Sequence, residues 1–200
     1  EKFKYGNLHN FININGQDIL VEILKNKTQV IFISGHFSNF ELMAQHIEKS
    51  NIKLAAIYRP LNNFFLNNTM EEIRKKFICK KQIKKGLSGT REVLKHINDG
   101  YSIALMIDQR VSEGIKVDFF NRKALTTTIP AQLIKKYKLN VVPVHIERQN
   151  KHYFNLYFNK PIIFDPSDDV EKITLKLNKN LEKMILKNPD QWIWSHNRWK

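Results

Sequence analysis

The pattern of apolar and polar positions predicts alternating strands and helices along most of the chain, most clearly between residues 29 and 49. The apolar run Val30-Ile31-Phe32-Ile33 predicts a buried strand over 29–34, because β-branched and aromatic side chains pack well on a pleated surface. Gly35 then permits a tight turn. From residue 38 onward, apolar side chains recur at helical spacing, which predicts a helix over 38–49.

The same two patterns predict the remaining elements. The expected strands cover 53–58, 101–107, 116–120, 141–146 and 153–158, with a further short strand within 1–15. The expected helices cover 19–24, about 15 residues from 64, 90–97 and 168–187, with one more beginning at Pro130. We interpret 86–89 as a loop, and Pro143 suggests an edge or irregular position for its strand. Alternation of strands and helices predicts one α/β domain over residues 1–200.

Three of the predicted strands are followed directly by polar or charged residues. These are His36 after the first strand, Arg59 after the second, and Asp108, Gln109 and Arg110 after the third. Ligands bind at the carboxyl edge of open α/β sheets, so we expect these side chains to converge there. Such a site can deprotonate a hydroxyl through its histidine and hold an oxyanion or a phosphate through its guanidinium groups.

Glu41 has two interpretations. Five residues separate it from His36, so the two side chains meet only if His36 lies in the loop and Glu41 in the first helical turn. A carboxylate in that position would fix the histidine tautomer and stabilise the protonated ring. Ser38 and Glu41 also form the pattern S-x-x-E, a capping box in which the glutamate satisfies only a backbone donor. The local pattern leaves both interpretations open.

Two segments rich in aromatic residues suit either a membrane surface or a protein core. Residues 64–77 carry an apolar stripe that runs into paired lysines, which is typical of a helix lying on a membrane. We favour a helix packed on the core with a solvated lysine face. All three tryptophans fall within 192–199. They suit an interfacial belt or a binding groove, and here too we favour packing.

Composition narrows the class of protein. A chain of 200 residues that is 42% hydrophobic and 26% charged can bury a real core. One cysteine, Cys79, excludes an internal disulfide framework and a cysteine-rich zinc site. No apolar segment reaches the roughly 18 to 20 residues that span a bilayer. The usual motifs for nucleotide binding and serine hydrolysis are also missing from the sequence.

The net charge of +14 points to nucleic acid or an anionic membrane as a partner. Of the 33 basic residues, however, 26 are Lys and 7 are Arg. Lys, Asn and Ile are abundant throughout, as an AT-rich genome would produce, so we discount the charge as evidence for nucleic acid. Attraction to anionic lipid needs only point charges near the surface, and the composition supplies them.

The segment Gly35-His36-Phe37-Ser38-Asn39-Phe40-Glu41 resembles the H-x-x-x-x-D/E motif of the lysophospholipid acyltransferase superfamily. It is most similar to the lipid A biosynthesis branch, the lauroyl and myristoyl transferases. Further matches in that branch's order are Tyr58-Arg59-Pro60, Asp108-Gln109, residues 114–120 and 126–130, Val142-Pro143-Val144 and the closing W-x-W-x-H-x-R-W. The resemblance covers nearly the whole chain. It implies a glycerolphosphate-acyltransferase-like fold, a central mixed and mostly parallel β-sheet flanked by helices.

The resemblance also implies a reaction. A fatty acyl chain would pass from an acyl carrier protein or coenzyme A thioester to a hydroxyl of a lipid A precursor or related glycolipid. His36 would be the general base and Glu41 its orienting carboxylate, with no covalent acyl-enzyme. The oxyanion or the acceptor phosphates would be held by Arg59 and Arg110, and Asp108 and Gln109 would complete the substrate site. Neither a metal nor a cofactor is implied.

The branch places its members on the cytoplasmic face of the bacterial inner membrane, beginning with a hydrophobic anchor helix. We expect the present chain to lack that anchor. Two alternative functions remain: a basic module that binds nucleic acid, and a non-catalytic protein of this fold that binds acyl lipids. The intact pair of His36 and Glu41 counts against the second alternative, and the lysine-rich composition counts against the first.

Overall fold

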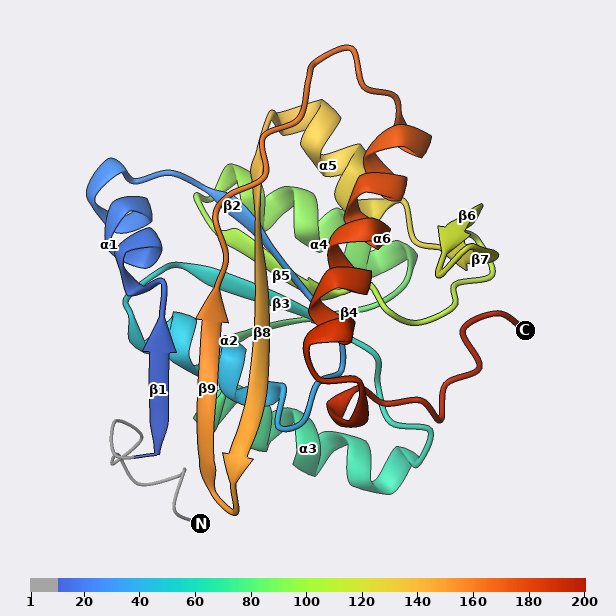
Figure 1. The fold of residues 1–200 in the computed structure, drawn as a ribbon. Coiled ribbons are helices and arrows are strands. Elements are labelled where there is room, and N and C mark those ends of the chain that lie inside the picture. Colours follow the sequence, from blue (N-terminus) through green and yellow to red (C-terminus); the bar gives the residue numbers. More distant parts are fainter. Residues whose placement is uncertain (1–10) are drawn as a thin grey trace.

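The computed structural model describes residues 11–200, and the part of the expected amino-terminal strand before residue 11 lies outside them. Among the described residues, seven strands form one sheet in the order β1-β9-β8-β2-β5-β3-β4 (Figure 1). These strands are β1 (Ile12–Asn15), β2 (Val30–Ser34), β3 (Leu54–Tyr58), β4 (Lys81–Lys84), β5 (Ser102–Met106), β8 (Asn140–Asn150) and β9 (Tyr153–Phe158). The predicted α/β architecture with a mostly parallel sheet is confirmed, because only β8 and β9 pair antiparallel within the described sheet.

Helices cover both faces of the sheet. They are α1 (Gln17–Asn26), α2 (Glu41–Lys49), α3 (Phe64–Phe77), α4 (Leu87–Asn98), α5 (Ile129–Tyr137) and α6 (Val170–Lys187). The connections through α2 (β2 to β3) and α3 (β3 to β4) lead toward the β4 edge of the sheet, and the connection through α4 leads back from β4 to β5. Since parallel crossovers are right-handed, α2 and α3 lie on one face and α4 on the other. Helix α6 packs against α5 and β8, in front of the sheet in Figure 1.

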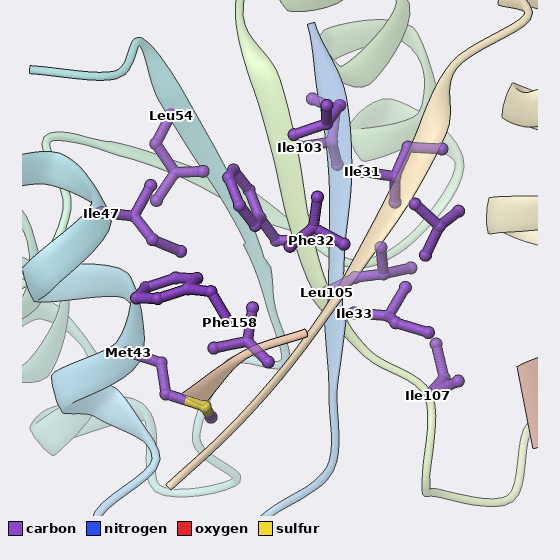
Figure 2. Close-up of a cluster of buried hydrophobic side chains, with 14 of the residues drawn as sticks. Ile31, Phe32, Ile33, Met43, Ile47, Leu54, Ile103, Leu105, Ile107 and Phe158 are labelled. Atoms are coloured by element: carbon purple, nitrogen blue, oxygen red, sulfur yellow. The ribbon is translucent and has the colours of Figure 1, made fainter. Parts of the chain in front are cut away.

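The core is centred on β2, which is buried along its whole length. Ile31, Phe32 and Ile33 are each at most 2% exposed. Phe32 points toward Met43 and Ile47 of α2, whereas Ile31 and Ile33 point to the opposite face (Figure 2). Burial on both faces explains why the β2 sequence is continuously apolar rather than alternating.

Two strands were not predicted, because neither is continuously apolar. Strand β4 is a lysine-rich strand at the sheet edge, where charged side chains discourage further pairing. Strand β7 (Arg122–Thr126) pairs with β6 (Ile115–Phe119) in a separate hairpin. Its two turn residues, Phe120 and Asn121, have positive φ angles of 50° and 58°, as a tight two-residue hairpin turn requires.

Two local predictions were wrong. The loop expected at 86–89 is mostly the start of α4, which begins at Leu87. Of the two positions expected for Pro143, an edge or an irregular one, the edge is wrong, because this residue lies inside the sheet. It is the last residue of β8 that pairs with β2, one position before the pairing with β9 begins. The missing N–H of this proline therefore falls where β8 passes from one neighbour to the other.

The carboxy-terminal segment packs against the hairpin, so the packing interpretation of the tryptophan cluster holds for Trp192, which is 3% exposed, and for Trp199. Arg198 is fully buried. Its guanidinium donates to the Leu125 carbonyl at 2.6 Å and to the Thr126 hydroxyl at 2.7 Å. These bonds tie the end of the chain to β7, whereas Trp194 is 53% exposed.

Helix α3 contradicts the prediction of a core-packed apolar stripe. Phe65, Leu66 and Ile73 are exposed by 87%, 55% and 36%, whereas Glu71 is buried. The Glu71 carboxylate accepts hydrogen bonds from Asn67 at 2.6 Å and from Lys84 of β4 at 2.9 Å. Polar groups therefore help to attach α3 to the sheet, and Phe65, Leu66 and Ile73 face outward, whereas Met70 and Phe77 are half-buried. Within residues 11–200, no helix is both long enough and apolar enough to cross a membrane.

We predict that Glu71 makes the stability of the protein pH-dependent below pH 4.5. Hydrogen bonds from the Tyr58 hydroxyl, then Lys84 and Asn67, lower the pKa of Glu71 from 4.5 to about 2. A carboxyl with a lowered pKa stabilises the folded state above its unfolded pKa and loses that contribution as the pH falls toward its folded pKa. The free energy of unfolding of wild type should therefore fall relative to Glu71→Gln between pH 4.5 and about 2.

Urea denaturation at a series of pH values measures this difference. Glu72→Gln, at the exposed neighbouring position, is the matched control and should follow wild type. Parallel pH profiles for wild type and Glu71→Gln would contradict the prediction.

Candidate active site

The site lies where three neighbouring parallel strands end. Strands β2, β5 and β3 are adjacent in the sheet, and Ser34 at the end of β2 is in register with Met106 at the end of β5. His36, Asp108 and Arg59 follow these strands, so the parallel topology brings them to one edge. A cavity of about 360 Å³ opens there, and His36, Arg59 and Gln109 are among its lining residues.

A buried carboxylate holds the His36 ring. Asp108, 2% exposed, accepts a hydrogen bond at Oδ1 from His36 Nδ1 at 2.8 Å. Its Oδ2 accepts the His36 backbone N–H at 2.8 Å and the Trp192 indole N–H at 2.9 Å. Since an ionised carboxylate only accepts, Nδ1 carries the ring hydrogen and Nε2 is left with a lone pair at the cavity.

The charge on Asp108 is maintained by its donors. Burial opposes ionisation, but the hydrogen bonds from His36 and Trp192 outweigh it and hold the pKa of Asp108 below its ordinary value. His36 is thus arranged to accept a proton at Nε2.

The structure gives Glu41 a different partner from either one expected. Its Oε1 lies 2.9 Å from Nε of Arg74 in α3. Helix α2 begins only at Glu41 and has no side-chain cap at Phe40, so the capping box is not formed. Among the described residues, no hydrogen bond joins Glu41 to His36. The contact predicted between them is therefore corrected: Asp108 contacts the ring, and the Glu41–Arg74 pair forms part of the cavity wall.

A second histidine reaches the cavity from the carboxy-terminal segment. Nε2 of His196 lies 3.0 Å from the side-chain amide nitrogen of Gln109, which in turn lies 3.5 Å from Nε2 of His36. The amide therefore stands between the two rings, whose centroids are 6.1 Å apart. Sequence reasoning placed His196 in a matched motif without a role, because nothing local connects it to a loop 87 residues away.

Besides Arg74, which is paired with Glu41, two further cations line the cavity. Arg59 and Lys85 both contribute to the lining. Partial desolvation lowers the pKa of Lys85, Glu113 opposes this shift, and the positive charge of Arg59 adds to it. Two neighbouring cations of this kind favour an anionic ligand. Arg110, the other arginine predicted for this role, is exposed and is not among the lining residues.

Apolar space adjoins the polar site. A cavity of about 60 Å³ between α2 and the sheet shares Ala56, Ile57 and Leu105 with the main cavity. Another of about 230 Å³, beside α4 and α5, shares Ile57, Lys85 and Ile129 with it. Hydrocarbon entering beside His36 thus has two apolar recesses within reach.

The described residues contain neither a reactive thiol nor a group of metal ligands. Cys79 is buried, and this burial raises the pKa of its thiol to about 12, so the sulfur stays protonated and is a poor nucleophile. Within the described part of the chain, no three His, Cys, Asp or Glu side chains are grouped to hold a metal ion.

Fold and site together define a class: α/β proteins in which a carboxylate–histidine pair at the carboxyl edge of the sheet can activate a hydroxyl. The family within this class follows from the sequence. Residues 2–200 match the model of the bacterial lipid A biosynthesis acyltransferases, and the chain belongs to that family.

Individual relatives agree with the family. The chain is 24% identical over 183 residues to lipid A biosynthesis acyltransferase 2 of Shigella flexneri, covering 90% of this chain and 58% of that protein. It is 22% identical over 186 residues to the lipid A biosynthesis myristoyltransferase of Escherichia coli (strain K12), covering 92% and 57% respectively. The chain thus spans just over half the length of these relatives.

A solved structure shares the fold. The 1-acyl-sn-glycerophosphate (LPA) acyltransferase PlsC from Thermotoga maritima superposes with a TM-score of 0.53 at 14% sequence identity. The match covers 91% of this chain and 73% of that one. At this identity the likeness concerns the fold alone, and it confirms the predicted acyltransferase-like α/β architecture.

We predict that Asp108→Asn moves the ring hydrogen of His36 from Nδ1 to Nε2. Two N–H donors bond Oδ2, so the amide oxygen of the asparagine should occupy that position. Its NH₂ group then faces Nδ1, which must become an acceptor. Nitrogen NMR of histidine-labelled protein distinguishes the two tautomers of the neutral ring.

The signals of His152, which lies away from this cavity, serve as an internal control and should not change. An unchanged Nδ1–H tautomer at His36 would mean that Asp108 does not determine it.

Proposed function

We propose that this protein transfers a fatty acyl chain from a thioester to a hydroxyl of a lipid A precursor or related glycolipid. The observation that carries the proposal is the Asp108–His36 pair, which leaves Nε2 of His36 as the proton acceptor at the cavity, 3.5 Å from the Gln109 amide. Family membership supports acyl transfer as the reaction class. The names of the relatives support lipid A biosynthesis as its setting.

In the proposed reaction His36 acts as general base. The acceptor hydroxyl donates a hydrogen bond to Nε2, and its proton passes to the ring as the oxygen attacks the thioester carbonyl carbon. Asp108 stabilises the imidazolium that results. When the C–S bond breaks, the imidazolium returns the proton to the leaving thiolate. The acyl chain moves directly to the acceptor without a covalent enzyme intermediate.

We assign Gln109 to the developing oxyanion. Its amide nitrogen lies 3.5 Å from Nε2, so a carbonyl undergoing attack beside the base would lie within reach of an N–H donor. His196, 3.0 Å from the same amide, would then position Gln109 rather than contact the substrate itself. Glu41 becomes a positioning residue in this scheme, because its carboxylate holds Arg74 against the cavity wall.

We assign the two lining cations to phosphate. Arg59 was predicted for this role, and Lys85 replaces Arg110 as its partner because Lys85 lines the cavity. A lipid A precursor carries phosphates, and so do the pantetheine arms of acyl carrier protein and coenzyme A. The acyl chains of donor and acceptor would use the apolar recesses of about 60 and 230 Å³. No cofactor takes part, and the proposed location is the cytoplasmic face of the bacterial inner membrane.

We predict that His36→Ala and Asp108→Asn each lower the rate of transfer by about 10²- to 10⁴-fold, the usual contribution of a general base. Glu41→Gln should cost less, since it removes a wall contact and leaves the base in place. The assay offers acyl carrier protein and coenzyme A thioesters as donors and a tetra-acylated lipid A precursor in detergent as acceptor.

His152→Ala is the matched histidine control and should retain wild-type activity. Transfer that survives His36→Ala would overturn the mechanism. A loss in Glu41→Gln as large as that in His36→Ala would assign Glu41 to the catalytic unit.

We predict that Arg59→Ala and Lys85→Ala raise KM for the phosphorylated acceptor by about tenfold each, as expected for the loss of a charge-assisted hydrogen bond. The value of kcat should change much less, because neither cation contacts Nε2. Steady-state kinetics with varied acceptor separates the two parameters. Arg91→Ala, an exposed arginine of α4, is the matched control. A fall in kcat with constant KM would contradict the assignment.

A further inference from the structure

The outward face of α3 has the wrong polarity for a helix in water. A helix on the surface of a globular protein normally turns apolar side chains to the core and polar ones to solvent. Among the described side chains of α3, Glu71 is buried, whereas Phe65 and Leu66 are exposed by 87% and 55%. Exposure of large apolar side chains in a group marks an interaction site rather than a solvated surface.

The exposed apolar side chains form one surface. Ile73 follows Phe65 by eight residues and Leu66 by seven, about two helical turns in each case, so the three side chains share one side of the helix. Leu61 precedes α3 and is 37% exposed, and its backbone N–H bonds to the Asn67 side chain at 3.0 Å. We call Leu61, Phe65, Leu66 and Ile73 the α3 surface. Leu61 also lines the cavity that contains His36.

Basic side chains border this surface. Lys75 and Lys76 in the last turn of α3 and Lys80 just after it are all exposed. Two acidic residues of α3 lie near these lysines: Glu71, which is buried and 4.0 Å from Lys75, and Glu72, which is exposed. The chain as a whole carries a net charge of +14. Apolar side chains with lysines beside them match an anionic bilayer, because the former enter the acyl boundary and the latter meet the phosphates.

We propose that the α3 surface docks on an anionic lipid bilayer and holds the mouth of the cavity against it. The inference rests on the proposed function for the identity of the substrate but not for the surface itself. Leu61 belongs both to the α3 surface and to the cavity lining, so docking places the cavity entrance at the lipid headgroups. An acceptor hydroxyl then reaches His36 while the hydrocarbon of the acceptor stays close to the bilayer.

Vesicle sedimentation tests the proposal with the purified chain and without any acyl donor or acceptor. We expect binding to vesicles of phosphatidylcholine with phosphatidylglycerol, and weaker binding to phosphatidylcholine alone. The variant Phe65→Ser/Leu66→Ser should lower the partition coefficient by about tenfold or more, since both side chains lose apolar burial. The variant Lys75→Gln/Lys76→Gln should lower it by about fivefold per lysine at low salt and by less at high salt.

The matched control is Val21→Ser/Leu24→Ser in α1, which removes two apolar side chains exposed by 54% and 39%. It should bind vesicles as wild type does, and circular dichroism checks that each variant is folded. The proposal is overturned if wild type does not bind anionic vesicles or if the α1 variant loses as much binding as the α3 variant. It is also overturned if Phe65→Ser/Leu66→Ser dissolves a dimer while vesicle binding is unchanged, which would make the surface a protein interface.

The outcomes separate this surface from the proposed function. Vesicle binding that depends on α3, with no acyl transfer by the same protein, would leave the surface standing and count against the acyltransferase proposal. Transfer to a detergent-dispersed acceptor by a protein that binds no vesicles would support the acyltransferase proposal and overturn the docking proposal.

Discussion

The buried carboxylate of Asp108 is the group on which the geometry of the site depends. It joins the loop after β2, the loop after β5 and the carboxy-terminal segment through three hydrogen bonds. A carboxylate removed from water is tolerated only when its oxygens are satisfied by donors, so the three segments must meet for the folded state to be stable. The same bonds fix which nitrogen of His36 faces the cavity. Stability and the capacity for acid–base chemistry therefore have a common origin.

The strand order of the sheet determines where each side chain of the site lies. Adjacent parallel strands β2 and β5 deliver the base and its carboxylate, and β3, on the other side of β5, delivers Arg59. His36, Arg59 and Lys85 thus line one cavity, with apolar recesses beside it. The Glu41–Arg74 ion pair joins α2 to α3 and forms part of the cavity wall. The proposed substrate, which carries phosphate, a reacting hydroxyl and hydrocarbon, is consistent with this arrangement.

Helix α3 relates that cavity to its surroundings. The helix is attached to the sheet in part through Glu71 and Lys84, and Phe65 and Leu66 face outward. An exposed apolar surface is a liability for a protein that meets only water. The use proposed for this surface, which shares Leu61 with the cavity lining, is docking on an anionic bilayer, with the neighbouring lysines at the lipid phosphates.

The sequence by itself determined the α/β architecture, the position of β2 in the core and the residues at the strand ends, and its ordered motifs resemble one family. Continuous apolar runs report burial directly, and parallel strands must bring His36, Arg59 and Asp108 to one edge. Only the tertiary structure decided that His36 bonds a carboxylate 72 residues away instead of Glu41, five residues away. It also decided which side of α3 faces the sheet. Local sequence patterns report the spacing of residues within one helix or strand. Hydrogen-bond partners and helix orientation depend instead on how strands distant in the sequence are arranged in the sheet.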